Sequence, residues 1–129
     1  MSVGIARTVH QVYAFVSDPE NLPQWATAFC LSVRRSGDEW IVGTPQGPVR
    51  VAFVAENDFG VLDHVVTLAS GIAILSPMRV VANGAGSEVV FTLFQPPGMS
   101  DAEFAADAAM VERDLGTLKA VLEVPGASG

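Results

Sequence analysis

His64 is the side chain of this sequence best suited to acid–base chemistry or to anchoring a polar group of a ligand. A neutral imidazole donates one hydrogen bond and accepts another, and its proton equilibrium lies near neutral pH. The alternative is a core histidine bonded to a backbone carbonyl or to water, as buried polar groups normally are. Asp63 precedes it, but successive strand side chains point to opposite faces, which argues against an Asp–His dyad. No second catalytic residue is indicated.

Five large apolar side chains are candidates for lining a ligand pocket together with His64: Trp25, Trp40, Phe53, Met78 and Phe91. Strand register, counted outward from the turns, sets Trp40 opposite Phe53 and Phe53 opposite His64. The predicted row across the inner face of a sheet is Trp40, Phe53, His64, Met78, Phe91. Trp25 lies on a short connecting helix, where it can form a pocket rim. Such residues suit a ligand site or an ordinary core, and in a strongly curved sheet both roles are compatible.

The place of His64 in this row depends on the hairpin at Ser70-Gly71. A two-residue loop puts His64 on the same face as Arg79, whereas one extra residue in the turn, or a bulge near Pro77, puts it opposite Met78. The second register separates apolar from charged side chains between the two faces. We therefore predict that His64 faces Met78.

Metal, disulfide and phosphate sites are not indicated, so we expect no metal and no cofactor. Cys30 is the only cysteine, which excludes an intrachain disulfide and a zinc site of paired cysteines, and we predict that it faces outward. His10 lies off the apolar face of its helix and is interpreted as a surface residue. Gly84-Ala85-Gly86 precedes a strand rather than a helix, which favours a tight hairpin over a dinucleotide site. Arg35, at an edge of the inner face, and Arg79, on the outer face, are candidates to neutralise an acidic ligand.

Strands bounded by Gly, Pro, Asn and Asp turns must position these side chains. Runs rich in Val, Ile, Phe and Thr predict strands at about 29–35, 39–44, 48–56, 61–69, 72–82 and 87–95, after a short opening strand at 3–6. Short loops between consecutive strands indicate an antiparallel meander.

Helical spacing marks the two ends of the chain. Thr8 and Gln11 form a capping box before an amphipathic helix that ends at Asp18-Pro19, and a short second helix follows around 20–28. Ser100 and Glu103 form a second capping box before a long helix. That helix carries one apolar stripe that must lie on a sheet: Phe104, Ala108, Val111, Leu115, Leu118 and Leu122.

Composition limits the class of protein. The chain has 129 residues, half of them hydrophobic, which fits a single domain over 1–129 with a proper core. The net charge is −7 and the seven basic residues are scattered, which argues against nucleic acid or an anionic membrane as the main partner. No apolar run approaches the length of a membrane span, and the first residues lack the pattern of a signal peptide. We therefore expect a cytoplasmic protein without membrane insertion.

This order of elements resembles the helix-grip fold of the START-like, polyketide-cyclase-type (SRPBCC) superfamily. The stretch from Val12 to Asn21, followed by Leu22-Pro23-Gln24-Trp25, resembles the opening helix pair of that superfamily. Residues 60–64 and 86–92 with the closing helix resemble a bacterial branch of it. The resemblance implies an α+β fold in which a curved antiparallel sheet of six to seven strands wraps around the long C-terminal helix, with two short helices after the first strand. It also implies a cavity between sheet and helix for a small apolar or aromatic molecule, and it transfers no catalytic motif.

Three functions remain open. The first is binding of a small apolar or aromatic molecule, as a carrier or sensor. The second is a cyclase or dehydratase that uses the same cavity with His64 as acid or base. The third is a protein-interaction module, in which the alanine-rich back of the long helix, with Met110, Thr117 and Val121, forms a contact such as a homodimer interface.

Overall fold

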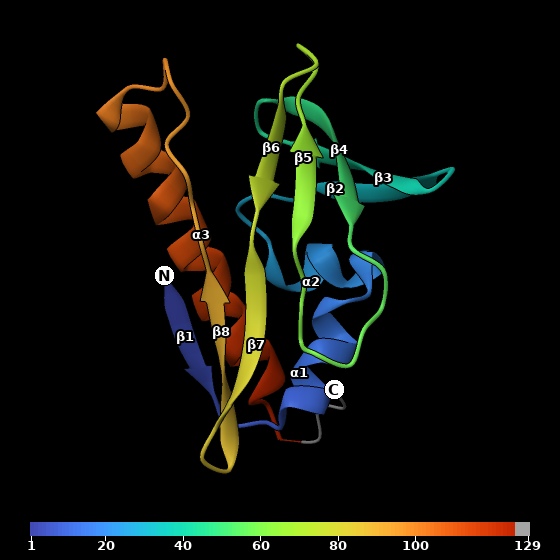
Figure 1. The fold of residues 1–129 in the computed structure, drawn as a ribbon, viewed down its shortest axis with the longest axis vertical. Coiled ribbons are helices and arrows are strands. Elements are labelled where there is room, and N and C mark those ends of the chain that lie inside the picture. Colours follow the sequence, from blue (N-terminus) through green and yellow to red (C-terminus); the bar gives the residue numbers. More distant parts are fainter. Residues whose placement is uncertain (126–129) are drawn as a thin grey trace.

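The computed structural model describes residues 1–125. The elements follow an α+β order, with the short helices after the first strand, the remaining strands in one run and the long helix at the end (Figure 1). In chain order the elements are β1 (Ser2–Ile5), α1 (Val9–Val16), the 3-10 helix η1 (Pro19–Asn21), α2 (Leu22–Trp25), β2 (Ser32–Ser36), β3 (Glu39–Thr44), β4 (Gly47–Phe53), β5 (His64–Thr67), β6 (Ala73–Ser76), β7 (Met78–Asn83), β8 (Gly86–Phe91) and α3 (Asp101–Leu122).

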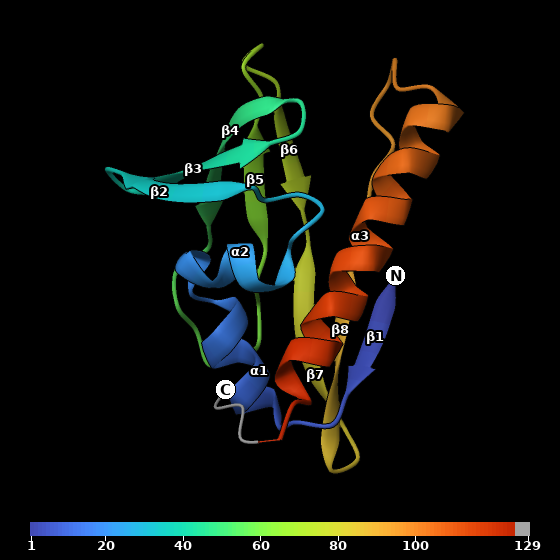
Figure 2. The same ribbon diagram turned by 180° about the vertical axis from the view of Figure 1, so that it is seen from behind.

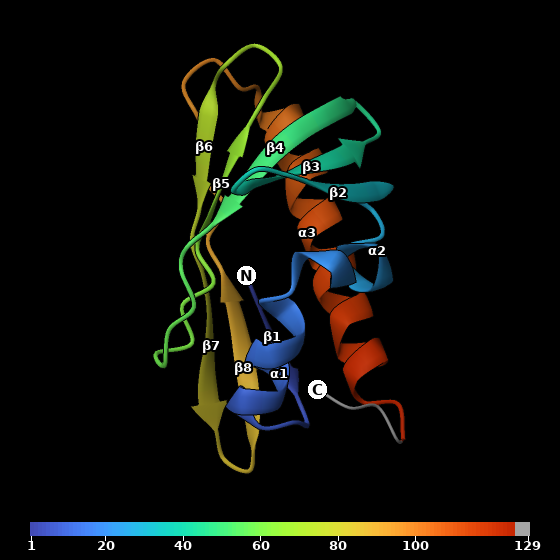
Figure 3. The ribbon, with the colours of Figure 1, turned by 90° about the vertical axis from the view of Figure 1, so that its right-hand side faces the viewer.

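Strands β5, β6 and β7 lie on one side of the molecule and α3 on the other, while β2, β3 and β4 extend toward the side on which α3 lies (Figure 3). Helix α1 packs on β7 and β8, while α2 and β1 contact α3. Figure 2 shows β1 alongside α3, and the N-terminal half of α3, in orange, at the same end of the molecule as β3 to β6. This arrangement confirms the predicted helix-grip fold class.

The strands form two antiparallel sheets, ordered β2-β3-β4-β5-β6 and β1-β8-β7. The strand predicted over 72–82 is divided into β6 and β7. Pro77 lies between them and has no backbone N–H, so it cannot continue the hydrogen bonding of the strand. An isolated bridge between Val61 and Arg79, and a 2.8 Å bond from Leu62 N to Met78 O, hold the two sheets side by side. Pro77 therefore marks the junction of the sheets.

The turn between β3 and β4 corrects one predicted pair. Thr44 pairs with Gly47, so the loop is two residues long, and Gly47 has a φ of 110° that favours glycine. Trp40 consequently lies opposite Val51, not opposite Phe53 as predicted. The shift is two residues, so Trp40 and Phe53 keep the same face.

The hairpin between β5 and β6 corrects a second pair. Leu68 N donates to Ile72 O at 2.9 Å, so the turn contains three residues, with Gly71 at a φ of 91°. The extra residue puts His64 opposite Ser76, not opposite Met78. The predicted pairs of Phe53 with His64 and of Met78 with Phe91 are confirmed.

Both predicted capping boxes are present, at Thr8 and at Ser100. The apolar stripe of α3 is buried at its C-terminal half, through Leu115, Leu118 and Leu122, and only partly buried at Phe104 and in the segment up to 111. The core thus lies where α1 and the C-terminal half of α3 face β1, β7 and β8, and it continues to Val42 on β3 and Val51 on β4, which are 0% and 1% exposed. Its central residues are Ile5, Val12, Val16, Val80, Val89 and Leu118.

Candidate functional site

His64 stands between two aromatic rings at the junction of the sheets. Its ring centroid is 5.0 Å from that of Phe53, its cross-strand partner on β4, and 6.0 Å from that of Phe91, on β8. All three side chains are partly buried rather than enclosed. Three members of the predicted row are therefore in contact, and this group of Phe53, His64 and Phe91 is called the aromatic triad below.

The hydrogen bonding of His64 determines which nitrogen carries its proton. Nδ1 lies 3.0 Å from the carbonyl oxygen of Leu62. A carbonyl only accepts, so Nδ1 must donate, and the neutral ring then keeps its lone pair on Nε2. Within residues 1–125 no group bonds to Nε2. Burial lowers the pKa of His64 below its ordinary value, which keeps the imidazole neutral near pH 7.

Asp63 takes no part in this site. Its carboxylate accepts from Arg79 Nη2 at 2.9 Å and from Met78 N at 2.9 Å on the other side of the strand. The Arg79 side chain holds the pKa of Asp63 below its usual range. Asp63 thus bonds to Arg79 and not to His64, in keeping with the opposite directions of successive strand side chains.

The loop before β5 fixes the position of His64. Asn57 Oδ1 accepts from Phe59 N at 3.0 Å and from Val61 N at 3.1 Å, and its Nδ2 donates to Val61 O at 2.9 Å. The hydroxyl of Tyr13 on α1 accepts from Asn57 N at 2.9 Å. These bonds tie the loop to itself and to α1, so β5 begins at a defined residue.

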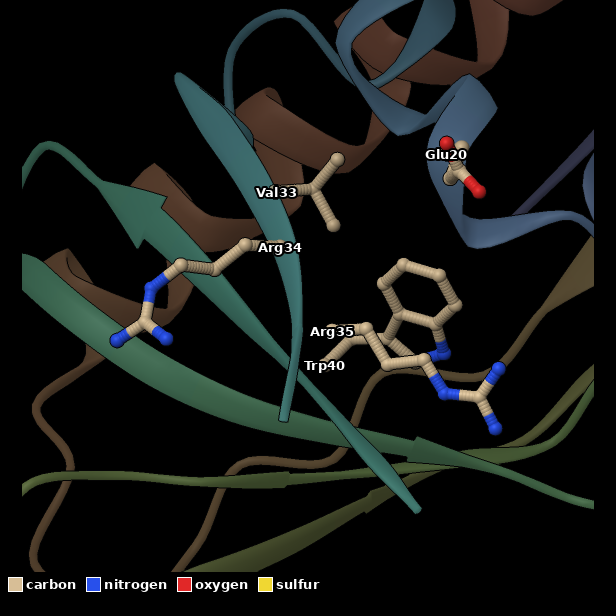
Figure 4. A pocket seen from close by; sticks show the side chains of 5 residues that line it. All are labelled: Glu20, Val33, Arg34, Arg35 and Trp40. Carbon is tan, nitrogen blue, oxygen red and sulfur yellow. The ribbon is translucent and has the colours of Figure 1, made fainter. Parts of the chain in front are cut away.

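Trp40 lines a separate hollow at the β2–β3 hairpin. The hollow has a volume of about 400 Å³ and is lined by Glu20, Val33, Arg34, Arg35 and Trp40. Figure 4 shows Val33 and the Trp40 ring directed toward the segment that carries Glu20, and Arg34 directed away from them. The guanidinium carbon of Arg35 lies 6.0 Å from the Trp40 ring centroid, within the range of a cation–π contact.

The two remaining predicted pocket residues are covered by the protein itself. Met78 is 1% exposed and belongs to the core. Trp25 on α2 is 7% exposed, and its indole Nε1 is buried without a hydrogen-bond partner among the described residues. The predicted set therefore divides into the aromatic triad, the hollow at Trp40, and two buried residues.

Asp114 is a buried carboxylate that sequence reasoning did not identify. It is 5% exposed on α3 and accepts from Ala28 N at 2.8 Å and Phe29 N at 3.2 Å, in the loop after α2. Burial raises its pKa above the usual value. The available signal was its position beside Leu115 in the apolar stripe, where an unpaired carboxylate would be costly.

Cys30 is buried rather than outward-facing as predicted, because the segment that carries it turns inward against α3 before β2 begins. Its thiol lies 3.3 Å from Ser32 O, and burial raises its pKa, which makes it a poor nucleophile. Among residues 1–125, no three His, Cys, Asp or Glu side chains are grouped as metal ligands. In the same part of the chain, no helix has the length and apolar character that crossing a bilayer requires.

The sequence matches one family model and no curated protein. The model of a family described as polyketide cyclase / dehydrase and lipid transport matches residues 1–123. A search of curated proteins finds no significant match.

Three solved structures illustrate the similarity of fold. An Aha1 protein from Colwellia psychrerythraea, solved in solution as a dimer, is 13% identical, with 98% of this chain and 96% of that chain covered and a TM-score of 0.76. DynU16, a protein of the dynemicin biosynthetic locus, is 18% identical over 98% of this chain and 47% of its own, with a TM-score of 0.71. The di-domain ARO/CYC protein StfQ of the steffimycin biosynthetic pathway is 13% identical over 93% of this chain and 48% of its own, with a TM-score of 0.59. This chain thus spans about half of the last two proteins, and at these identities the likeness concerns the fold.

Proposed function

Because the chain belongs to the polyketide cyclase / dehydrase and lipid-transport family, we propose that it binds a small apolar or aromatic molecule between its sheet and α3. The observation that carries this proposal is the aromatic triad, in which His64 keeps an unpartnered Nε2 between Phe53 and Phe91. The protein acts as a carrier or sensor, with residues 1–129 working as one START-like domain.

The triad suits a ligand with a flat ring and one hydrogen-bond donor. Aromatic rings prefer offset or edge-to-face neighbours, which the two phenylalanines offer. The Nε2 lone pair accepts a hydrogen bond from a hydroxyl, phenol or enol group, and Nδ1–H stays fixed on Leu62 O. The site therefore favours a ligand with a hydrogen-bond donor near Nε2, and it disfavours a ligand that places an acceptor there.

Catalysis by the same group is the second candidate, as a cyclase or dehydratase. Neutral His64 is already in the form of a general base, since burial lowers its pKa. In such a step Nε2 removes a proton from the substrate, and the resulting imidazolium keeps its Nδ1–H bond to the Leu62 carbonyl. The same imidazolium then returns the proton to a leaving hydroxyl, which departs as water.

The first test is binding of a neutral aromatic probe, N-phenyl-1-naphthylamine, measured by its fluorescence. We expect saturable binding that weakens in His64→Ala, because the anchor for the probe's N–H is removed. His10→Ala is the matched control, since His10 is exposed on α1. An absence of saturable binding, or equal affinity in all three proteins, contradicts the proposal.

Native mass spectrometry of the protein from its own host then separates binding from catalysis. A co-purified molecule that leaves unchanged on release supports a carrier or sensor. Conversion of that molecule by fresh protein, lost in His64→Ala while binding persists, supports the enzyme.

A further inference from the structure

We propose that the hollow at Trp40 binds the anionic end of the ligand, so that the ligand class is an aromatic or other flat apolar molecule carrying a carboxylate or similar monoanion. Arg35 supplies the positive charge, and Trp40 with Val33 supplies the apolar wall. This inference rests on the proposed function and specifies its substrate class.

The guanidinium of Arg35 has unused donors. Its Nε donates to Gly37 O at 3.0 Å, which fixes the side chain on its own hairpin. Both terminal nitrogens lack protein acceptors within residues 1–125. They offer the paired N–H groups that bind a carboxylate in a two-point contact.

Arg35 forms no ion pair among the described residues. Three of the seven basic residues form ion pairs within residues 1–125: Arg50 with Glu39, Arg79 with Asp63, and Lys119 with Glu123. Arg34 and Arg35 form none there, although Glu20 lines the same hollow. Arg34 points away from the hollow (Figure 4), so Arg35 supplies the guanidinium that a ligand seated against Trp40 would meet.

The Arg35 guanidinium matters because the whole protein carries a net charge of −7. The overall field repels an anion, so an anionic ligand needs a nearby guanidinium to bind. A cationic ligand would gain from the overall field but would meet the Arg35 guanidinium at this hollow. The hollow therefore favours an anion.

Strand register places Arg35 and Trp40 of the hollow on the same face of their sheet as Phe53 and His64 of the aromatic triad. Arg35 lies opposite Trp40, and Trp40 lies opposite Val51. Phe53 is two residues further along β4 on the same face, and it pairs with His64. One elongated ligand can thus place its anion at Arg35 and its ring system toward His64.

The test compares two fluorescent probes that share an anilinonaphthalene body, the anion 1-anilinonaphthalene-8-sulfonate and neutral N-phenyl-1-naphthylamine. In Arg35→Gln we expect the affinity for the anion to fall about tenfold, the size of a lost charge-assisted contact. Affinity for the neutral probe should change less than about twofold, which also shows that the variant is folded. Glu20→Gln should tighten anion binding about twofold, because the opposing carboxylate is removed.

Arg50→Gln is the charge-matched control, since Arg50 lies on the outer face of β4 and is exposed. Equal loss of anion affinity in Arg35→Gln and Arg50→Gln overturns this inference and leaves the proposed function standing. Failure of the neutral probe to bind the unmodified protein overturns the proposed function itself. A tenfold loss confined to Arg35→Gln and to the anionic probe supports both.

Discussion

Two regions of the inner surface differ in how completely their apolar side chains are covered. In the closed region, where α1 and the C-terminal half of α3 meet β1, β7 and β8, Val12, Val89 and Leu118 are 0% exposed. In the open region, where β4, β5 and the end of β8 carry the aromatic triad, Phe53, His64 and Phe91 stay partly exposed. Apolar content alone does not distinguish the two regions.

The difference shows how one fold serves stability and binding at separate ends. Removing apolar surface from water stabilises the folded state in proportion to the area removed, so the fully buried side chains of the closed region stabilise the fold. The open region leaves apolar area and the Nε2 lone pair of His64 uncovered, where a ligand can use them. Each prediction below sets a residue of one region against a residue of the other or of their border.

The largest effect is expected in the closed region, at Leu118. Leu118→Ala should lower the free energy of unfolding by about 3 kcal/mol, because it leaves a cavity in a fully packed site. Val111→Ala, about two helical turns toward the open region and only partly buried, should lower it by about 1 kcal/mol. Urea denaturation of both variants measures the contrast, and equal losses would contradict the division into two regions.

Asp114 tests the border between the regions. Asp114→Ala should lower the unfolding free energy by about 2 kcal/mol, because two backbone N–H groups, of Ala28 and Phe29, lose their acceptor. Asp107→Ala is the matched control, because Asp107 lies on the same helix and makes no hydrogen bond within residues 1–125. Comparable losses in the two aspartate variants would contradict an anchoring role.

Asp114 also predicts a pH dependence with a definite sign. Burial raises its pKa, so the folded protein takes up this proton more readily than the unfolded chain. Its contribution to stability is therefore most favourable below the ordinary carboxyl pKa and declines as pH rises through the raised value. The stability of the wild type relative to Asp114→Asn, measured in urea across that range, should fall as pH rises.

The closed region is the part of the molecule that sequence reasoning describes best. Capping boxes at Thr8 and Ser100 are local signals, and the stripe through Leu115 and Leu118 has helical spacing, so both were predicted without knowledge of the partner. Turn residues also predicted the register of β7 with β8 through Met78 and Phe91. Caps, helical stripes and hairpin registers are determined by residues close together in the sequence, which is why sequence reasoning can predict them.

The open region depends on geometry that periodicity does not encode. A two-residue turn at Thr44 to Gly47 and a three-residue turn before β6 moved Trp40 and His64 relative to their predicted partners. The predicted face of each side chain was still correct, because side chains alternate along a strand and a shift of two residues keeps them on the same face. The hydrogen bonds of Asp114 were not predicted, since they join residues 85 and 86 positions apart.

His64 makes the open region sensitive to acid. Its pKa is lowered by burial, so the unfolded chain binds this proton more readily than the folded protein. Its stabilising contribution is present above the ordinary histidine pKa and is lost as pH falls through the folded value. His64→Phe should flatten this part of the stability curve measured in urea, and a curve unchanged from the wild type would contradict it.

The smallest effect is expected on the outer face, at the Asp63–Arg79 pair that spans the junction of the sheets. Arg79 is about half exposed, with a side-chain exposure of 49%, so Arg79→Gln should lower the unfolding free energy only slightly. Asp63→Ala should cost about 1.5 kcal/mol, because Met78 N also loses its acceptor beside Pro77. Urea denaturation distinguishes the two, and a larger loss in Arg79→Gln would mean that the ion pair, rather than the backbone bond to Met78, holds the closed and open regions together.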